Sequence, residues 1–178
     1  MADPEIVDNR NVIDEFKGMP VDEIRSILET RRHPFSVLLC NIQYDINTGN
    51  IVRTANAFSA SRILIYGRRN FDKRGAVGTY IYENMVYVRK DTELPDAIGN
   101  DTLIAVDNTS GSVPIHKFEW PENPCLVFGH ESEGISEDVK KLCKMSVAVP
   151  QSGSVRSMNV ATAAGITMYD LLLRRGWL

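Results

Sequence analysis

The chain lacks long hydrophobic runs. Its apolar stretches are short and interrupted by polar residues, so none reaches the roughly 20 residues that a membrane-spanning helix requires. The first ten residues, MADPEIVDNR, also lack the basic and then apolar pattern of a signal peptide. These absences predict a cytoplasmic protein that has no membrane as a partner.

Cysteine is scarce, and neither sign of charge is in large excess. Only three cysteines occur among 178 residues, Cys40, Cys125 and Cys143, and they lie far apart among mostly apolar neighbours. This placement favours reduced thiols in the core over a disulfide framework or a metal site. The formal net charge of −3 argues against a uniformly basic protein that coats nucleic acid, although local basic clusters are present.

Repeats, linkers and the common nucleotide-binding fingerprints are also missing. No internal repeat and no linker rich in proline or glycine occurs, which predicts one core domain. GxGxxG after a strand and GxxxxGK[ST] are both absent, so neither a dinucleotide fingerprint nor a P-loop explains the polar loops described below.

The sequence does contain short apolar runs that alternate with helical patterns. The segment PVDEIRSILETRR, from Pro20, has the spacing of an amphipathic helix. This helix would belong to an N-terminal extension over residues 1–34. Over residues 35–178, strands are expected at FSVLLCNI, RILIYG, MVYVRK, TLIAVDN, CLVFGH and MSVAVP, with helices between them. This alternation predicts an α/β fold with a mostly parallel sheet flanked by helices. Ligands of such sheets bind at the carboxyl ends of the strands.

The first notable polar segment is NTGNIVRTANAF, from Asn47 to Phe58. Asn47 is expected to cap a helix, and Gly49 permits close approach of another backbone. Arg53 follows two aliphatic residues, in a helix whose surroundings should be largely buried, so it needs an anionic partner or a cleft. A functional and a structural role for Arg53 are equally compatible with this pattern.

Two further segments follow strands near the C-terminus. VFGHESEGIS carries Gly129, Glu131 and Gly134, which suits either a ligand-facing backbone or an ordinary strand-to-helix loop. VPQSGSVRSMNVATAAG leads into a helix expected over Ser157–Arg174. That helix is apolar nearly all round, so it should be covered by the sheet on one side and by a partner subunit on another.

In this order, the three segments resemble the three motifs of the SPOUT superfamily, in particular its SpoU/TrmH branch of RNA ribose 2′-O-methyltransferases. The first motif is matched by Asn47, Ile51, Val52, Arg53, Thr54 and Ala55. The second is matched by LVFGHESEGI and the third by VPQSGSVRSMNVATAAG. The resemblance spans about Phe35 to the C-terminus.

The resemblance implies a C-terminal deep trefoil knot, a homodimer, and S-adenosylmethionine held by three loops of the knot. The reaction it implies is methyl transfer, without a metal, to a ribose 2′-hydroxyl of tRNA or rRNA. The dimer would bury Ala164, so a large charged residue there is expected to disrupt it. The residues implied at the cofactor are Ala105, Val106, Asp107, Gly129, Val149, Ser154 and Met158. The catalytic set implied is Arg53, Asn47, Glu131, Ser157 and Asn159.

RNA contacts are expected from basic residues. Arg156 lies inside the third motif, and the other candidates are Arg31, Arg32, Arg68, Arg69, Lys73 and Arg74. Tyr66 and Phe71 are aromatic neighbours that could stack on unpaired bases. Two alternatives stay open: a non-catalytic knotted module that binds RNA or assists assembly, and a nucleotide-binding α/β protein without a knot.

Overall fold

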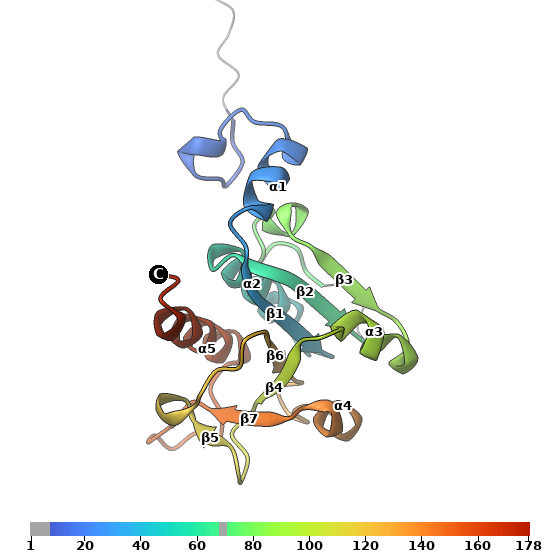
Figure 1. Ribbon diagram of the computed structural model, residues 1–178, viewed down its shortest axis with the longest axis vertical. Coiled ribbons are helices and arrows are strands. Elements are labelled where there is room, and N and C mark those ends of the chain that lie inside the picture. Colours follow the sequence, from blue (N-terminus) through green and yellow to red (C-terminus); the bar gives the residue numbers. More distant parts are fainter. Residues whose placement is uncertain (1–7, 68–70) are drawn as a thin grey trace, which may run out of the picture.

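The computed structural model describes residues 8–67 and 71–178. Seven strands form one sheet in the order β3-β2-β1-β6-β4-β7-β5, and every neighbouring pair is parallel (Figure 1). The expected α/β class and mostly parallel sheet are therefore confirmed. The strands are β1 His33–Cys40, β2 Ala60–Tyr66, β3 Met85–Val88, β4 Thr102–Val106, β5 Val113–Pro114, β6 Pro124–Phe128 and β7 Met145–Ala148.

Helices cover both faces of the sheet. On one face, α2 and α5 pack against alternate residues of β1 and β2, such as Leu39 and Ile63, whereas α3 and α4 pack against Leu38 and Leu64 on the other face (Figure 1). Because both faces are covered, β1 is a nearly continuous apolar run and not an alternating one. The helices are α1 Val21–Glu29, α2 Asp45–Ala57, α3 Leu94–Ile98, α4 Glu137–Leu142 and α5 Val160–Arg175, with short 3-10 turns at Asp14–Phe16, Thr79–Tyr82, Asp91–Glu93 and Ile115–Lys117.

Helix α5 begins three residues later than the sequence suggested. Asn159 is its N-cap, because the Asn159 side chain accepts hydrogen bonds from the backbone N–H groups of Ala161 and Thr162. The expectation for Ala164 is also wrong, since this residue is fully buried in the core between α5 and the rest of its own chain. A large charged side chain there would disrupt the subunit itself.

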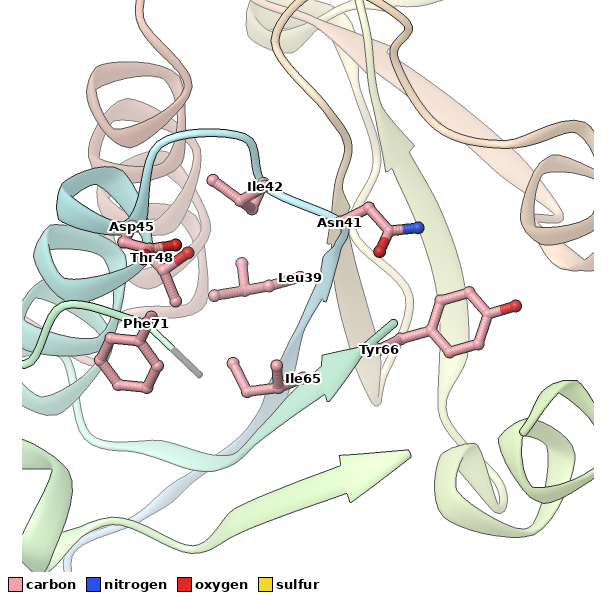
Figure 2. Close-up of a pocket in the computed structure, with 8 residues that line it drawn as sticks. All are labelled: Leu39, Asn41, Ile42, Asp45, Thr48, Ile65, Tyr66 and Phe71. Atoms are coloured by element: carbon pink, nitrogen blue, oxygen red, sulfur yellow. The ribbon is translucent and has the colours of Figure 1, made fainter. Parts of the chain in front are cut away.

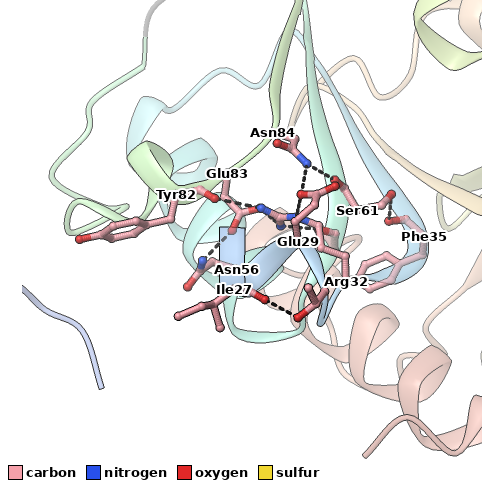
Figure 3. A network of polar contacts seen from close by, with 11 residues as sticks. Ile27, Glu29, Arg32, Phe35, Asn56, Ser61, Tyr82, Glu83 and Asn84 are labelled. Carbon is pink, nitrogen blue, oxygen red and sulfur yellow. Dashed lines mark hydrogen bonds and ion pairs between the residues drawn. The ribbon is translucent and has the colours of Figure 1, made fainter. Parts of the chain in front are cut away.

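The N-terminal segment is tied to the sheet by a buried ion pair. The Arg32 guanidinium is 6% exposed and lies 2.7 Å from the Glu83 carboxylate, which is 1% exposed (Figure 3). Arg32 also donates to the carbonyl oxygens of Ala60 and Tyr82, and Asn56 donates to Glu83. Burial raises the pKa of Glu83, although the hydrogen bond from Asn56 and the charge of Arg32 oppose this effect. Arg32 is therefore a structural residue, and the expectation that it contacts RNA phosphate is wrong.

The cysteines are free, as expected. Cys40 and Cys125 are buried and Cys143 is partly buried. Burial raises the pKa of Cys143 to about 11 and that of Cys125 to about 12, so these thiols stay protonated at neutral pH. No helix in residues 8–67 or 71–178 is long and apolar enough to cross a bilayer.

Candidate active site

A cleft of about 680 Å³ lies at the carboxyl ends of β4, β6 and β7. The segments that follow these three strands supply most of its lining, as the position of strand ends in a parallel sheet dictates. Its volume is in the range of sites for small molecules and cofactors. The lining includes Val106–Thr109, Phe128–Ile135, Lys140, Val149, Gln151, Arg156–Val160 and Ala163.

The loop after β6 is folded back on itself. The backbone N–H of His130 donates to the Gly134 carbonyl at 3.0 Å, and the N–H of Gly134 donates to the His130 carbonyl at 2.8 Å. Gly129 lies against this closure so closely that a Cβ at Gly129 would sit 2.3 Å from the carbonyl carbon of Gly134. Gly134 itself has φ +73°, a conformation that favours glycine. Both glycines of the second motif are thus required by the shape of the loop.

Glu131 leaves this loop and reaches the start of α2. Its carboxylate accepts hydrogen bonds from the backbone N–H of Gln43 at 2.7 Å and from Nδ2 of Asn47 at 2.8 Å, and a longer one from the N–H of Tyr44 at 3.4 Å. In turn, Nδ2 of Asn159 donates to Oδ1 of Asn47 at 3.1 Å. One residue from each of the three motifs therefore joins a single chain of hydrogen bonds.

The environment of Glu131 favours its ionised form. Partial burial raises the pKa of Glu131, but the hydrogen bonds from Asn47 and from the backbone of Gln43 and Tyr44 together outweigh it and lower the pKa below its ordinary value. Asn47 is 6% exposed and lies within α2 instead of capping it. The structure therefore corrects the role expected for Asn47, whose amide bridges Glu131 and Asn159.

Comparison with known proteins identifies the family to which the chain belongs. A model of the SpoU rRNA Methylase family matches residues 34–169, a range that contains all three motif segments up to α5. The chain belongs to the SpoU rRNA methylase family.

Individual SpoU proteins are similar over most of this chain. The chain is 26% identical over 168 residues to the 23S rRNA (uridine(2479)-2′-O)-methyltransferase of Streptomyces viridochromogenes, covering 88% of this chain and 58% of that protein. The crystal structure of the SpoU methyltransferase AviRb from the same organism, in complex with AdoMet, matches with a TM-score of 0.72 at 25% identity over 81% of this chain and 59% of that one. The TrmH/SpoU tRNA modifying enzyme of A. aeolicus shares the fold, with a TM-score of 0.75 at 21% identity over 88% of this chain and 84% of that one.

The chain spans less than two thirds of the length of the Streptomyces protein.

The SpoU motif arginine does not enter the cleft of its own chain. Arg53 is exposed on α2, it is not among the cleft-lining residues, and within the described part of the chain it forms no ion pair or hydrogen bond. Helical geometry explains this, because six positions along an α-helix turn a side chain to about 120° around the axis from Asn47. The expectation of a largely buried Arg53 is therefore wrong.

Most of the residues expected at the cofactor line the cleft. Val106, Asp107, Gly129, Val149 and Met158 do so, as does the catalytic candidate Ser157. Two expectations fail: Ala105 is buried in the core on the face of the sheet that α3 and α4 cover, and Ser154 is exposed outside the lining. Ala105 and Val106 differ because successive strand residues point to opposite faces of the sheet.

Three of the basic candidates, Arg31, Lys73 and Arg74, have intramolecular partners. The Arg31 guanidinium pairs with Glu15 and lies 5.4 Å from the centre of the Phe16 ring, while remaining partly exposed. Arg74 pairs with Asp72, and the Lys73 ammonium lies 4.5 Å from the centre of the Tyr80 ring.

Among the remaining candidates, Arg156 is exposed and lines the cleft. Arg68 and Arg69 lie outside the described residues.

The two aromatic candidates lie on opposite sides of β2. Figure 2 shows Phe71 beside Leu39 and Ile65 on the side of α2, whereas Tyr66 points to the other side. Phe71 packs against the core, and the Tyr66 hydroxyl donates to Asp91 at 2.8 Å. Phe71 is therefore a core residue and not a stacking platform for bases.

Several polar residues of the cleft were not singled out from the sequence, among them Lys140 and His130. Lys140 on α4 lies 3.6 Å from the Asp107 carboxylate, and the pairing joins residues 33 positions apart, so no local pattern reports it. His130 stands between Gly129 and Glu131 of the second motif, two positions after β6 ends, and that place beside a strand end is the signal that identifies it. No group of three or more His, Cys, Asp or Glu side chains in residues 8–67 and 71–178 is arranged to hold a metal.

Proposed function

We propose that this protein transfers a methyl group from S-adenosylmethionine to a ribose 2′-hydroxyl of tRNA or rRNA. The observation that carries the proposal is the hydrogen-bonded chain Glu131–Asn47–Asn159, which joins the three motifs beside the cleft. The SpoU relatives named for 2′-O-methylation of 23S rRNA, and the AviRb structure with AdoMet, support the same reaction. A non-catalytic module would have no need for this polar set.

The cleft fits S-adenosylmethionine. Residues of three loops line it, and the loop closed between His130 and Gly134 leaves no room for a side chain at Gly129. Apolar atoms of Phe128, Val149 and Met158 suit a flat purine ring, while backbone donors and acceptors read its edge without a charged side chain. When bound, the cofactor would supply a methyl group on a sulfonium, whose sulfur would leave as a neutral thioether as the 2′-oxygen takes the methyl group.

The residues of the chain orient and stabilise the attacking ribose. Glu131 holds α2 against the cleft, and Ser157 and Arg156 line it from the segment after β7. A guanidinium stays protonated in proteins, so Arg53 binds an RNA phosphate and stabilises the developing alkoxide, and it does not act as a base. The proton passes to water or to another group.

A second copy of the chain covers the outward side of α2 and α5. Ile166, Tyr169 and Leu173 on α5 are 39%, 51% and 57% exposed. Arg53 lies on the outward side of the adjoining helix, where Thr54 approaches Gly165. Large apolar side chains grouped on one face are typical of subunit interfaces. In this dimer, Arg53 of one subunit would approach the cleft of the other subunit, because it does not reach the cleft of its own chain. We also propose that the C-terminal segment is threaded as a deep trefoil knot.

The test is nucleoside analysis of RNA from cells with and without the gene, complemented by wild type, Arg53→Ala or Arg25→Ala. Arg25 is an exposed arginine on α1, so its variant controls for loss of one surface charge. We expect one 2′-O-methyl nucleoside to disappear in the deletion and to return with wild type and Arg25→Ala. Arg53→Ala should lower turnover at least a hundredfold, since one well-placed charge donor contributes roughly 3 kcal/mol. Unchanged RNA in the deletion strain would refute the proposed function.

A further inference from the structure

The His130 side chain accepts hydrogen bonds inside the loop that follows β6. Its Nδ1 lies 3.2 Å from the backbone nitrogen of Ser132, 3.3 Å from that of Glu133 and 3.1 Å from the Ser132 hydroxyl oxygen. Backbone N–H groups only donate, so Nδ1 must be the acceptor. The imidazole is therefore neutral and carries its proton on Nε2.

These bonds sit within the closure between His130 and Gly134. The two backbone hydrogen bonds of that closure define the ends of the loop, and the imidazole fixes the residues between them. Glu131 projects from this stretch to Gln43 and Asn47. Whatever fixes the backbone at 132–133 thus also fixes the direction of the Glu131 carboxylate.

We infer that neutral His130 is a positioning residue that holds Glu131 and the cofactor-facing backbone in place, and that its protonation releases them. The inference rests on the proposed function for its link to the cofactor. Protonated imidazole carries N–H on both nitrogens, so Nδ1–H would face the two backbone donors and the hydrogen bonds would be lost. The loop is held at pH values where the imidazole is neutral and is released where it is charged.

The charged groups near His130 come from four parts of the cleft. Glu131 and Glu133 belong to the loop, Asp107 follows β4, Lys140 comes from α4 and Arg156 follows β7. Lys140 pairs with Asp107, and Glu131 is held by α2. Glu133 contributes only its backbone N–H to His130. A substitution at His130 that keeps an acceptor but cannot take up a proton separates the two parts of the inference.

Asparagine is that substitution, because its side-chain oxygen can accept from backbone N–H groups two and three residues ahead and does not titrate. The experiment compares wild type with His130→Ala, His130→Asn and His116→Asn, the last an exposed histidine outside the cleft. Protection of the Ser132 and Glu133 amides from hydrogen exchange is measured by NMR at about pH 5.5 and pH 8, a range in which histidines change charge. Calorimetry with S-adenosylmethionine follows at the same two pH values.

We expect wild type and His116→Asn to lose amide protection and cofactor affinity at the lower pH. His130→Asn should keep both at either pH, whereas His130→Ala should lose protection at both and bind roughly tenfold more weakly at pH 8, as the loss of one to two net hydrogen bonds implies. Equal protection in His130→Ala and wild type, or an acid loss that persists in His130→Asn, would overturn the inference. A wild type that shows the exchange pattern but binds no cofactor would instead refute the proposed function and leave the role of His130 in the loop established.

Discussion

Replacement of Glu131 by glutamine tests the hydrogen bonds that connect the second motif to the start of α2. The carboxylate accepts three hydrogen bonds, two of them at 2.7 and 2.8 Å. A glutamine side chain has one acceptor oxygen, so in either orientation its NH2 group faces at least one N–H donor. One close hydrogen bond is lost, and the other no longer has a charged acceptor. We therefore expect a loss of about 2 kcal/mol in the free energy of unfolding, given the usual worth of hydrogen bonds to charged groups.

The assay is urea unfolding at pH 7.5 of wild type, Glu131→Gln and Glu133→Gln. Glu133 belongs to the same loop, is exposed, and contributes no side-chain bond within the described part of the chain, so its variant should stay within about 0.5 kcal/mol of wild type. Equal unfolding midpoints for the two variants would contradict the hydrogen-bond geometry on which the site is built.

The stability difference between wild type and Glu131→Gln should depend on pH. The pKa of Glu131 is lower in the folded state than its ordinary value of 4.5, so its stabilisation is fully present above pH 4.5 and is lost as the pH falls through the lower folded-state value. Glutamine does not titrate. The stability difference between wild type and Glu131→Gln should therefore shrink in acid, and a difference that grows as the pH falls would show that the sign is wrong.

Two further substitutions, each with a control, test the loop after β6 and the proposed dimer. Gly129→Ala places a methyl group 2.3 Å from the backbone of Gly134, so it should lower the free energy of unfolding by about 1–3 kcal/mol and weaken cofactor binding. The control Gly153→Ala places a methyl group that meets nothing within 4 Å, and it should be near neutral. Urea unfolding and calorimetry measure the two effects. Tyr169→Arg should give a monomer in sedimentation velocity that still binds cofactor, while Leu142→Arg on α4, across the sheet, should leave the dimer intact; dimeric Tyr169→Arg would place the interface elsewhere.

Local pattern predicts the strands of the sheet, whereas the resemblance to the SpoU/TrmH motifs indicates the polar set of the site. The run from Phe35 to Cys40 is apolar enough to be a strand buried on both faces, and it is one. Asn47, Glu131 and Asn159 stand at the carboxyl ends of strands or the starts of helices, and parallel topology brings such positions together. The resemblance to the three SpoU/TrmH motifs therefore groups these residues, and the hydrogen bonds that join them come from the structure.

What local pattern does not predict is the partner of a charged side chain. Arg31 and Arg32 are adjacent and indistinguishable in the sequence, yet Arg31 is exposed and Arg32 is buried. The difference lies in Glu83, 51 positions further on, which reaches Arg32 only after β2 and the following segment have folded. The direction of Arg53 is hidden for a related reason, because the start of α2 at Asp45, and so the phase of the helix, decides which side chains face the cleft.

The distribution of positive charge at the site connects the proposed dimer to the proposed methyl transfer. Lys140 and Arg156 are the lysine and arginine among the cleft-lining residues of the described chain, and Lys140 is paired with Asp107. A 2′-hydroxyl in RNA lies near phosphates, so cations around it favour both RNA binding and stabilisation of the developing alkoxide. Arg156 supplies one from within the chain. In the proposed dimer, Arg53, on the outward side of α2 beside the exposed face of α5, would supply another once a second copy covers that face. Tyr169→Arg should therefore abolish methyl transfer along with the dimer, even though the cofactor cleft of each subunit is left whole.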